Sequence, residues 1–260
     1  GRPGNFGATI FNAAFRAMNL NYIYKPFCVS PDNLEDAIKG IRAFGIRGCG
    51  VTMPHKKEVM KYLDKIDDAA QRIGAVNTIV NDAGVLSGYN TDYEGAKRAL
   101  KETYDIRNKK AFIIGAGGAA RAIIVALKDS GASEIIITNR DEQRGRDLAK
   151  EFSIKYHSFD KRTECKAQLL VNATPVGMPP NVQEIVVDSQ VLTQYRACMD
   201  LVVSSSKTGL VQAMEDLKRV VIPGHKMAVY QGIAQFKLYT GMDAPEPILR
   251  SAIHSYLISL

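Results

Sequence analysis

Hydrophobic positions follow two alternating spacings along the chain, and the alternation predicts an α/β fold with mainly parallel sheets. Short apolar runs of strand length are separated by segments whose apolar residues recur every three or four positions. The predicted strands are residues 22–29, 48–53, 76–80, 84–90, 134–139, 169–174, 197–203 and 218–223. The predicted helices are residues 8–19, 33–45, 92–104 and 142–152, with two more within 224–260.

Turn and cap residues refine these elements. The sequence NDAG at 81–84 separates two predicted strands and is typical of a hairpin. Ser30 or Asp32 is expected to cap the helix at 33–45, and Asp92 is expected to cap the helix that follows it.

The pattern changes near residue 109, where a nearly all-apolar strand, a glycine turn and a helix follow within 19 residues, KKAFIIGAGGAARAIIVAL. This segment begins a second α/β unit, so we place the boundary inside the helix at 92–104. We predict a first unit over 1–93, a Rossmann-type dinucleotide-binding unit over 94–222, and C-terminal helices over 223–260.

The composition is typical of a globular protein and does not by itself indicate a function. The 260 residues, 46% of them hydrophobic and 23% charged, are enough for two ordinary domains with packed cores. No apolar run reaches the roughly 18–20 residues that span a bilayer, and no signal peptide opens the sequence. Because the sequence starts with Gly rather than Met, we expect the natural chain to begin upstream, with a further strand.

Charge and cysteine content predict a cytoplasmic protein that binds neither nucleic acid nor metal. The net charge of +7 is modest, and basic blocks such as 107–110 lack interleaved aromatic residues. The four cysteines are far apart and form no metal-binding or disulfide spacing. A basic site for a carboxylated or phosphorylated small molecule agrees with this charge.

The glycine turn is the first candidate site. Gly115, Gly117 and Ala120 have the spacing of a dinucleotide-binding fingerprint, and a strand precedes them while a helix follows. In this arrangement backbone N–H groups at the helix start face a pyrophosphate. A glycine-rich turn of another α/β protein is the less favoured interpretation. The predicted cofactor-binding residues of the turn are Gly115, Ala116, Gly117, Gly118 and Ala119.

The residues after the strand at 134–139 indicate which dinucleotide is bound, NADP or NAD. An acid usually binds the ribose hydroxyls of NAD at this point, whereas here the strand ends in Asn139-Arg140, with Arg144 on the next helix. A guanidinium suits a 2′-phosphate, which favours NADP. Asp141 and Glu142 follow directly and would oppose that phosphate, so NAD stays as the alternative.

Lys56 and Asp92 form the second candidate site. Each follows a predicted strand, and ligands of α/β sheets bind beyond the carboxyl ends of strands. An ammonium can protonate the alkoxide that forms when a carbonyl is reduced, and a nearby carboxylate would hold it in place. Taken alone, Lys56 is better explained as a surface lysine and Asp92 as a helix cap.

With their flanking residues these positions resemble the shikimate dehydrogenase family. VTMPHK (51–56), GAVNTIV (74–80) and YNTD (89–92) are similar to three segments of its substrate half. GAGGAAR (115–121) and NATPVGM (172–178) are similar to its cofactor half. The segment from Tyr230 to Gly241 is similar to its closing helix.

The resemblance implies two domains with a cleft between them, the helices at 223–260 returning to the substrate domain. It implies reversible hydride transfer between NADP and a ring carbon of an alicyclic hydroxy acid, with Lys56 and Asp92 as the catalytic pair. Thr52, Asn77 and Gln231 would bind the ring hydroxyls. The implied cofactor-binding residues beyond the turn are Asn139, Arg140, Arg144, Thr174 and Met227. The expected protein is a monomer or a homodimer.

Several departures from the family pattern concern the substrate carboxylate and hydroxyls. The two serines of the family's first loop correspond to Asn5 and Gly7, the Asn before V-T-x-P corresponds to Gly50, and a substrate-facing Tyr corresponds to Val203. Asn5 can still donate its amide to a carboxylate. We therefore expect a divergent member that acts on shikimate, or on quinate or an amino-substituted analogue.

Two other functions are weighed against this one. A dinucleotide-binding regulatory protein with little catalysis is favoured by the lost serines and Tyr, and opposed by Lys56, Asp92 and Gln231. A reductase of an unrelated carbonyl compound would share the cofactor half but leave 76–78 and 89–92 without a role.

Overall fold

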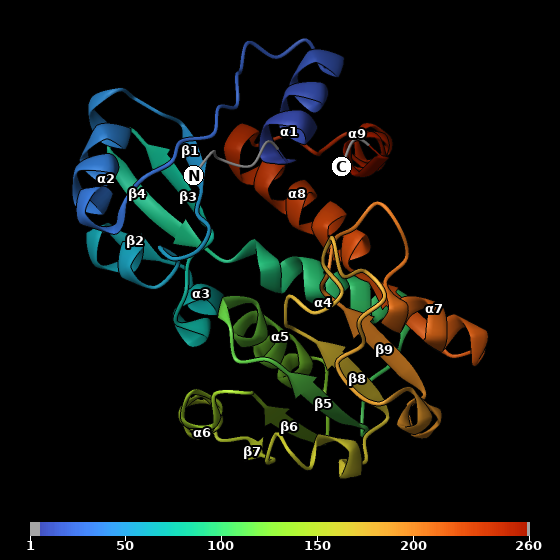
Figure 1. The fold of residues 1–260 in the computed structure, drawn as a ribbon. Helices are drawn as coiled ribbons and strands as arrows, with labels where there is room; N and C mark the ends of the chain where they lie inside the picture. Colours follow the sequence, from blue (N-terminus) through green and yellow to red (C-terminus); the bar gives the residue numbers. More distant parts are fainter. Residues whose placement is uncertain (1–5, 259–260) are drawn as a thin grey trace. The chain divides into compact units, whose positions relative to one another are not determined.

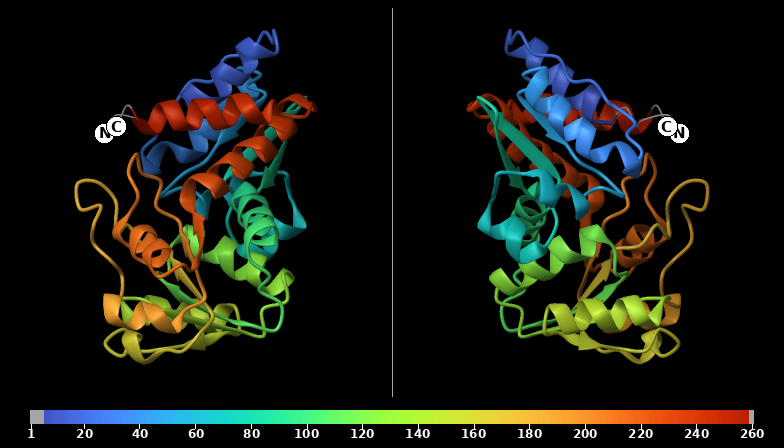
Figure 2. Two further views of the ribbon diagram at one scale, coloured as in Figure 1. Left: turned by 90° about the vertical axis from the view of Figure 1, so that its right-hand side faces the viewer. Right: turned by 90° about the vertical axis from the view of Figure 1, so that its left-hand side faces the viewer.

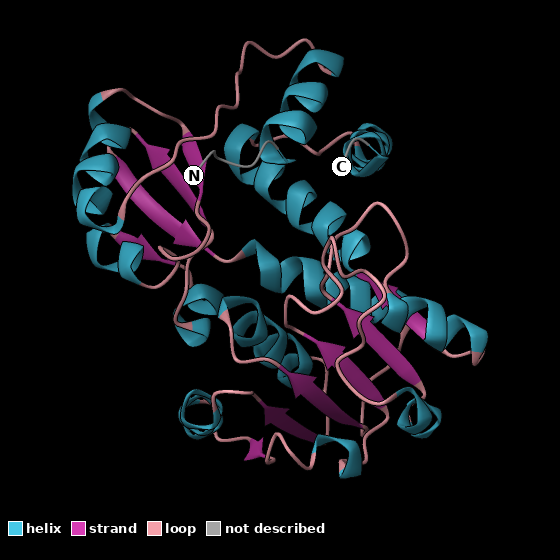
Figure 3. Ribbon diagram, viewed as in Figure 1, coloured by secondary structure: helices cyan, strands magenta, loops and turns pink. Residues whose placement is uncertain are grey.

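The structure, a computed structural model, describes residues 6–258 (Figures 1 and 3). Within the described residues the chain divides into two compact units, the first ending at Glu94 and resuming from Val229 onward, the second formed by Gly95–Ala228. Each unit has its own sheet. The predicted α/β class is confirmed.

The first unit is built on a four-stranded sheet in the order β1-β3-β4-β2. Its strands are β1 (Gly48–Gly50), β2 (Lys65–Ile66), β3 (Thr78–Asp82) and β4 (Val85–Tyr89). Its helices are α1 (Phe6–Ala17), α2 (Leu34–Ala43), α3 (Asp68–Ile73) and α9 (Glu246–Ile258), while α4 (Thr91–Thr103) and α8 (Gly224–Thr240) each belong to both units. Its short 3₁₀ turns are η1 (Pro31–Asn33) and η2 (Glu58–Tyr62).

This first sheet is mixed, so the expected parallel pairing applies chiefly to the sheet of the second unit. β3 is antiparallel to both β1 and β4, and only β2 and β4 are parallel. The predicted hairpin causes this, because Ala83 and Gly84 have φ of 51° and 95° and turn the chain back within two residues. β1 and β4 consequently run in the same direction, and their carboxyl ends lie at the same edge of the sheet.

Different elements cover the two faces of the first sheet. Ile38 and Ile41 of α2 pack with Ile79 and Leu86 on one face. Thr78 precedes Ile79 and therefore faces the other way, where Gln235 of α8 contacts it. Figures 1 and 2 show α1 beside α9 in this unit.

Residues 22–29 form no strand, so this prediction is wrong. No strand among the described residues pairs with them. The side chain of Asn12 instead binds both backbone groups of Tyr24, accepting from its N–H at 2.8 Å and donating to its carbonyl at 3.0 Å. An apolar, β-branched sequence makes a strand only where a partner backbone is available.

The predicted caps and one strand end are also corrected. Ser30 and Asp32 do not cap α2, which follows the turn η1 and has no side-chain cap at Asn33. Helix α4 begins at Thr91, so Asp92 lies in its first turn. The strand predicted over 48–53 ends at Gly50.

The second unit has a wholly parallel six-stranded sheet in the order β10-β9-β8-β5-β6-β7. The strands are β5 (Lys110–Ile114), β6 (Glu134–Thr138), β7 (Lys155–Tyr156), β8 (Leu169–Asn172), β9 (Ala197–Asp200) and β10 (Val220–Pro223). Between them lie α5 (Gly118–Asp129), α6 (Glu142–Glu151) and α7 (Gly209–Asp216), with 3₁₀ turns η3 (Arg162–Glu164) and η4 (Ser189–Gln194). Counted from β5, the order is 3-2-1-4-5-6, that of a Rossmann fold.

The strand order reverses between β5 and β8, and ligands of such sheets bind at the carboxyl ends of the strands at this point. The glycine turn follows β5 and Thr174 follows β8, so both lie there. None of the helices within residues 6–258 combines the length and the apolar character needed to cross a membrane.

Candidate active site

Lys56 and Asp92 form an ion pair at one edge of the first sheet, with 2.6 Å between Nζ and Oδ2. Lys56 lies in the turn after β1 and Asp92 in the first turn of α4, directly after β4. Both strands end at the same edge, which brings the two residues together. The backbone of Lys56 is held as well, because its carbonyl accepts from the N–H of Val76.

Asp92 is a fixed partner of the lysine because both side chains are largely shielded from solvent and Asp92 lies at a helix start. The side chain of Asp92 is 7% exposed, and that of Lys56 is 17% exposed. A negative charge in the first turn of a helix is stabilised by the partial positive charge of the unpaired N–H groups. The ammonium is therefore anchored on one side, and its remaining protons stay accessible.

Asn77 is 1% exposed and is hydrogen-bonded to Thr91, the residue that precedes Asp92 in the chain. Its Oδ1 accepts from the N–H of Thr91 at 2.8 Å, from the hydroxyl of Thr91 at 3.1 Å and from the hydroxyl of Thr78 at 2.8 Å. Its Nδ2 is buried and has no hydrogen-bond partner among residues 6–258. Buried donors are rarely left unpaired, which makes this amide a candidate donor to a ligand.

The other predicted substrate residues are not joined to this set. Thr52 is exposed in the turn after β1, and Gln231 is half-buried on α8. No hydrogen bond among the described residues connects either side chain to Asn77 or Asp92. Asn5 lies outside the described residues.

Gln235 is a further buried polar residue beside this set, and no sequence motif predicts it. It is 7% exposed, and its Nε2 donates to Oγ1 of Thr78 at 2.9 Å. The one available signal was its position four residues after Gln231, which places both side chains on the same face of α8.

The two glycines that replace polar family residues both face Tyr24. A Cβ at Gly7 would lie 2.9 Å from the Tyr24 ring, and a Cβ at Gly50 would lie 2.7 Å from its hydroxyl. Burial raises the pKa of Tyr24 to about 12, so its hydroxyl stays neutral. A side chain at either position would require the end of the Tyr24 ring to move.

The glycine turn of the second unit is shaped for a backbone-bound anion. Gly115 has a φ of 111°, and a Cβ there would lie 2.6 Å from the carbonyl of Ala173, so glycine is required. A Cβ at Gly117 would meet nothing within 4 Å, so the space before the turn is open. Helix α5 begins at Gly118 without a side-chain cap, and its first N–H groups stay available.

Two predicted cofactor residues hold the turn itself. Oδ1 of Asn139 accepts from the N–H of Ala116 at 3.2 Å, and Nε of Arg144 donates to the carbonyl of Ala116 at 2.9 Å. Ala119 is half-buried in the first turn of α5, and Met227 is buried in α8.

Arg140 is exposed at the end of β6 and makes no hydrogen bond or ion pair within residues 6–258. The acids beside it are engaged elsewhere. Asp141 caps α6 by accepting from the N–H of Arg144. Hydrogen bonds from Ser158 and Arg146 lower the pKa of Glu142. The guanidinium of Arg140 is thus the available charged group at this strand end.

Thr174 belongs to a second buried network. Its hydroxyl donates to Oδ1 of Asn172 at 2.7 Å, and Nδ2 of Asn172 donates to Asp200 at 2.9 Å. Thr208 also donates to Asp200. Burial raises the pKa of Asp200.

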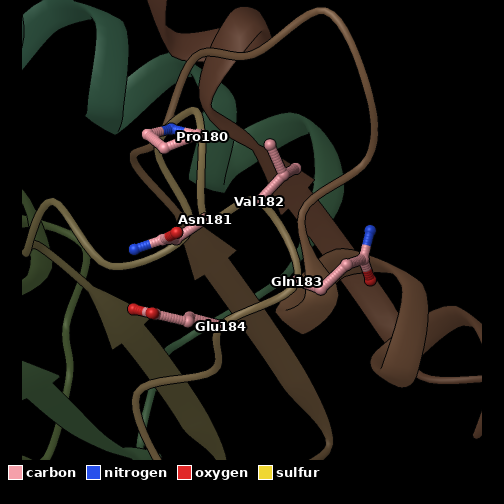
Figure 4. Close-up of a pocket in the computed structure, with 5 residues that line it drawn as sticks. All are labelled: Pro180, Asn181, Val182, Gln183 and Glu184. Carbon is pink, nitrogen blue, oxygen red and sulfur yellow. The ribbon is translucent and has the colours of Figure 1, made fainter.

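A surface hollow of about 400 Å³ lies on the loop after β8 (Figure 4). Its lining residues, Pro180–Glu184, include none of the predicted site residues. Within the described residues there is also no group of three or more His, Cys, Asp or Glu side chains that could hold a metal ion.

Three family models match the chain. Residues 6–79 match the shikimate dehydrogenase substrate binding domain, residues 96–203 match shikimate / quinate 5-dehydrogenase, and residues 224–254 match the shikimate 5′-dehydrogenase C-terminal domain. Together these matches cover most of the sequence.

Individual relatives are similar along nearly their whole length. An NADP(+) shikimate dehydrogenase of Methanothermobacter thermautotrophicus is 38% identical over 95% of this chain and 90% of its own. A shikimate dehydrogenase solved in complex with NADP+ is 39% identical, with a TM-score of 0.90 over 97% of this chain and 91% of its own. The shikimate 5-dehydrogenase of Thermus thermophilus, solved with NADP(H) and shikimate, is 31% identical, with a TM-score of 0.87 over 97% of this chain and 95% of its own. This chain belongs to the shikimate dehydrogenase family.

Proposed function

We propose that this protein is an NADP-dependent shikimate dehydrogenase that catalyses reversible hydride transfer at one ring carbon of shikimate or a close analogue. The observation that carries the proposal is the Lys56–Asp92 ion pair, 2.6 Å long, beside the unpaired amide of Asn77. An acid–base group and an unsatisfied donor at one sheet edge suit a substrate rich in hydroxyl groups.

In the proposed reaction Lys56 supplies the proton. During reduction its ammonium donates to the oxygen of the forming alkoxide, and during oxidation the neutral amine takes the hydroxyl proton. Asp92 holds Nζ in place and stabilises the ammonium. Asn77 donates Nδ2–H to a second ring oxygen, and Thr52 and Gln231 bind the remaining hydroxyls.

The residues of the second unit fit a dinucleotide. Gly115, Gly117 and Gly118 combine an obligatory glycine, open space and a free helix start, as a pyrophosphate requires. Arg140 is placed to bind a 2′-phosphate, which favours NADP over NAD. When bound, the nicotinamide gives or accepts the hydride. We propose that residues 94–222 bind NADP and that 1–93 with 223–260 bind the ring acid.

The substrate carboxylate would be recognised differently from the family pattern. Gly7 and Gly50 carry no side chain, and Tyr24 occupies the space next to both. Because of this observation, quinate and an amino-substituted analogue stay as alternative substrates to shikimate. A regulatory protein with little catalysis stays as the alternative function.

The decisive experiment is a nicotinamide absorbance assay with shikimate, quinate and aminoshikimate, on the wild type, Lys56→Ala and Lys57→Ala. Lys57 is the adjacent, exposed lysine and serves as the control. Loss of general acid–base catalysis predicts a decrease in kcat of about 10²–10⁴-fold for Lys56→Ala alone. Unchanged NADPH binding by that variant would show that the fold is retained. Full activity of Lys56→Ala would refute the mechanism, and tight NADPH binding without turnover of any acid would favour the regulatory protein.

Cofactor choice is tested separately with Arg140→Leu. Loss of a charge-assisted hydrogen bond of about 1.5–3 kcal/mol predicts about 10–100-fold weaker NADP binding, with little effect on NAD. Lys150→Leu, at an exposed position of α6, controls for general loss of positive charge. Equal weakening for both dinucleotides would contradict the role of Arg140.

A further inference from the structure

Gln235 donates a hydrogen bond to Thr78, and Thr78 donates one to Asn77. The three side chains thus form a chain of hydrogen bonds in which each donor points toward Asn77. We propose that Gln235 is a positioning residue that fixes the amide of Asn77 for binding a substrate hydroxyl. The inference rests on the proposed function, because it gives Asn77 a ring hydroxyl as its ligand.

The direction of the chain follows from what each group can do. The amide nitrogen of Gln235 can only donate, and Oδ1 of Asn77 can only accept. The Thr78 hydroxyl has one hydrogen and lies 2.9 Å from the first group and 2.8 Å from the second. Thr78 therefore accepts from Gln235 and directs its single hydrogen to Asn77.

The orientation of the Asn77 amide is set independently by a backbone group. The N–H of Thr91 lies 2.8 Å from Oδ1 of Asn77, and an N–H can only be accepted by the amide oxygen. With the hydroxyls of Thr78 and Thr91, Oδ1 has three donors. Nδ2 must consequently point away from all three, and it is the atom left without a partner.

Without Gln235, Oγ1 of Thr78 would lose the hydrogen bond that it accepts, and this bond fixes the orientation of the hydroxyl. It could then rotate toward Oγ1 of Thr91, which lies 3.2 Å away, and leave Asn77 with fewer donors. Terminal amide torsions are broad and need hydrogen bonds to define them. Hydrogen bonds in a chain also polarise one another, so the donors on Oδ1 strengthen Nδ2–H as a donor.

The lack of a side chain at Gly50 leaves space for Gln235 to reach Thr78. Gly50 pairs with Thr78 in the sheet, and a Cβ at Gly50 would lie 3.7 Å from Nε2 of Gln235. A longer side chain would extend from that Cβ into the space shared by Gln235 and Tyr24. Gly50, which departs from the family pattern, and Gln235 are thus compatible neighbours.

The first test compares Gln235→Met and Gln235→Glu with Gln212→Met. Methionine keeps the length but removes the donor, and glutamate accepts from Thr78 and draws its hydrogen away from Asn77. Gln212 is an exposed helical Gln whose amide also donates, to Asp216, which makes it a matched control. For the ring acid that the wild type turns over best, we expect kcat/KM to fall about 3–10-fold with Gln235→Met and further with Gln235→Glu. KM for NADP should be unchanged in all variants.

A double-mutant cycle with Thr78→Val tests the relay itself. If Gln235 acts through Thr78, Gln235→Met should have little further effect on kcat/KM in the Thr78→Val background. Additive losses, or a kcat/KM within twofold of the wild type for Gln235→Met, would overturn the proposal.

A spectroscopic test does not depend on turnover and so separates this proposal from the proposed function. The Asn77 side-chain amide signals can be assigned by ¹⁵N NMR from their loss in Asn77→Asp. We expect Gln235→Met to shift these signals and Gln212→Met to leave them in place. Unmoved signals would refute the positioning role even in an active enzyme, whereas shifted signals in a protein inactive on every ring acid would refute only the proposed function.

Discussion

Two buried asparagines, one in each unit, have opposite hydrogen-bond status. Asn77 and Asn172 are each 1% exposed. Asn172 uses both ends of its amide, with Nδ2 donating to Val176 and Asp200 and Oδ1 accepting from Thr174. Asn77 uses only its oxygen.

We infer from this difference that Asn172 is a structural amide and that Asn77 is a ligand-binding amide. A fully paired buried amide stabilises the loops it joins, whereas a buried donor without a partner costs free energy of about 1–3 kcal/mol. Such a cost persists where a ligand repays it. Asn172 should therefore matter chiefly for stability, and Asn77 chiefly for activity.

The largest expected effect is on stability, from Asn172→Asp. The new carboxylate would face Asp200 at the 2.9 Å distance now spanned by a hydrogen bond. An uncompensated buried charge predicts a loss of about 3–5 kcal/mol in the free energy of unfolding at neutral pH. Denaturant unfolding measures this loss, and Asn181→Asp in the exposed loop serves as the control. A loss below about 1 kcal/mol would remove the contrast between the two asparagines.

Asn77→Asp should have the next largest effect, and mainly on activity. The variant keeps an oxygen for its three donors, the Thr91 N–H and the hydroxyls of Thr78 and Thr91, which compensate much of the new charge, but it replaces the Nδ2 donor with a second oxygen. We expect kcat/KM for the ring acid to fall about 10–100-fold, equivalent to about 1.4–2.8 kcal/mol, while the KM for NADP stays constant. Steady-state kinetics with each substrate varied in turn provide the measurement. A variant with wild-type kinetics would show that Nδ2 binds no substrate.

The smallest effect concerns the pH dependence contributed by Asp200. Burial raises its pKa in the folded state above the ordinary value of 3.8, so the folded protein holds this proton more tightly. The stability it contributes is fully present below pH 3.8 and is lost as the pH rises through the raised pKa. Relative to Asp200→Asn, the wild type should thus become less stable across this window. Unfolding curves of both proteins at several pH values provide the measurement, and a wild type that gains stability relative to Asp200→Asn as the pH rises would contradict the raised pKa.

The fold class and the family were predictable from sequence because both depend on patterns along the chain. The wholly parallel sheet around the glycine turn follows from strand–turn–helix segments of regular length. The strand at 22–29 was wrong because its backbone is bound by the side chain of Asn12, a contact that no local pattern encodes. The predicted cap of α2 at Ser30 or Asp32 was wrong for a similar reason, because a 3₁₀ turn precedes this helix.

The candidate site was predictable only where motifs place polar residues after strands. Lys56 and Asp92 could be paired because both follow strands, and the structure joins them by a hydrogen bond. Their catalytic role stays a prediction. Gln235 could not be identified, because its position depends on how α8 packs on β3, and a helical glutamine has no sequence signature of its own.

The short turn at Ala83-Gly84 has a practical consequence. Thr78 and Tyr89 pair at the end of the hairpin beside Asn77, whereas Ala83 and Gly84 lie at its opposite end. A Cβ on Gly84 would meet nothing within 4 Å, so this tip has free space around it. An epitope or a fluorescent reporter inserted there would report on the first unit without touching the groups proposed for chemistry.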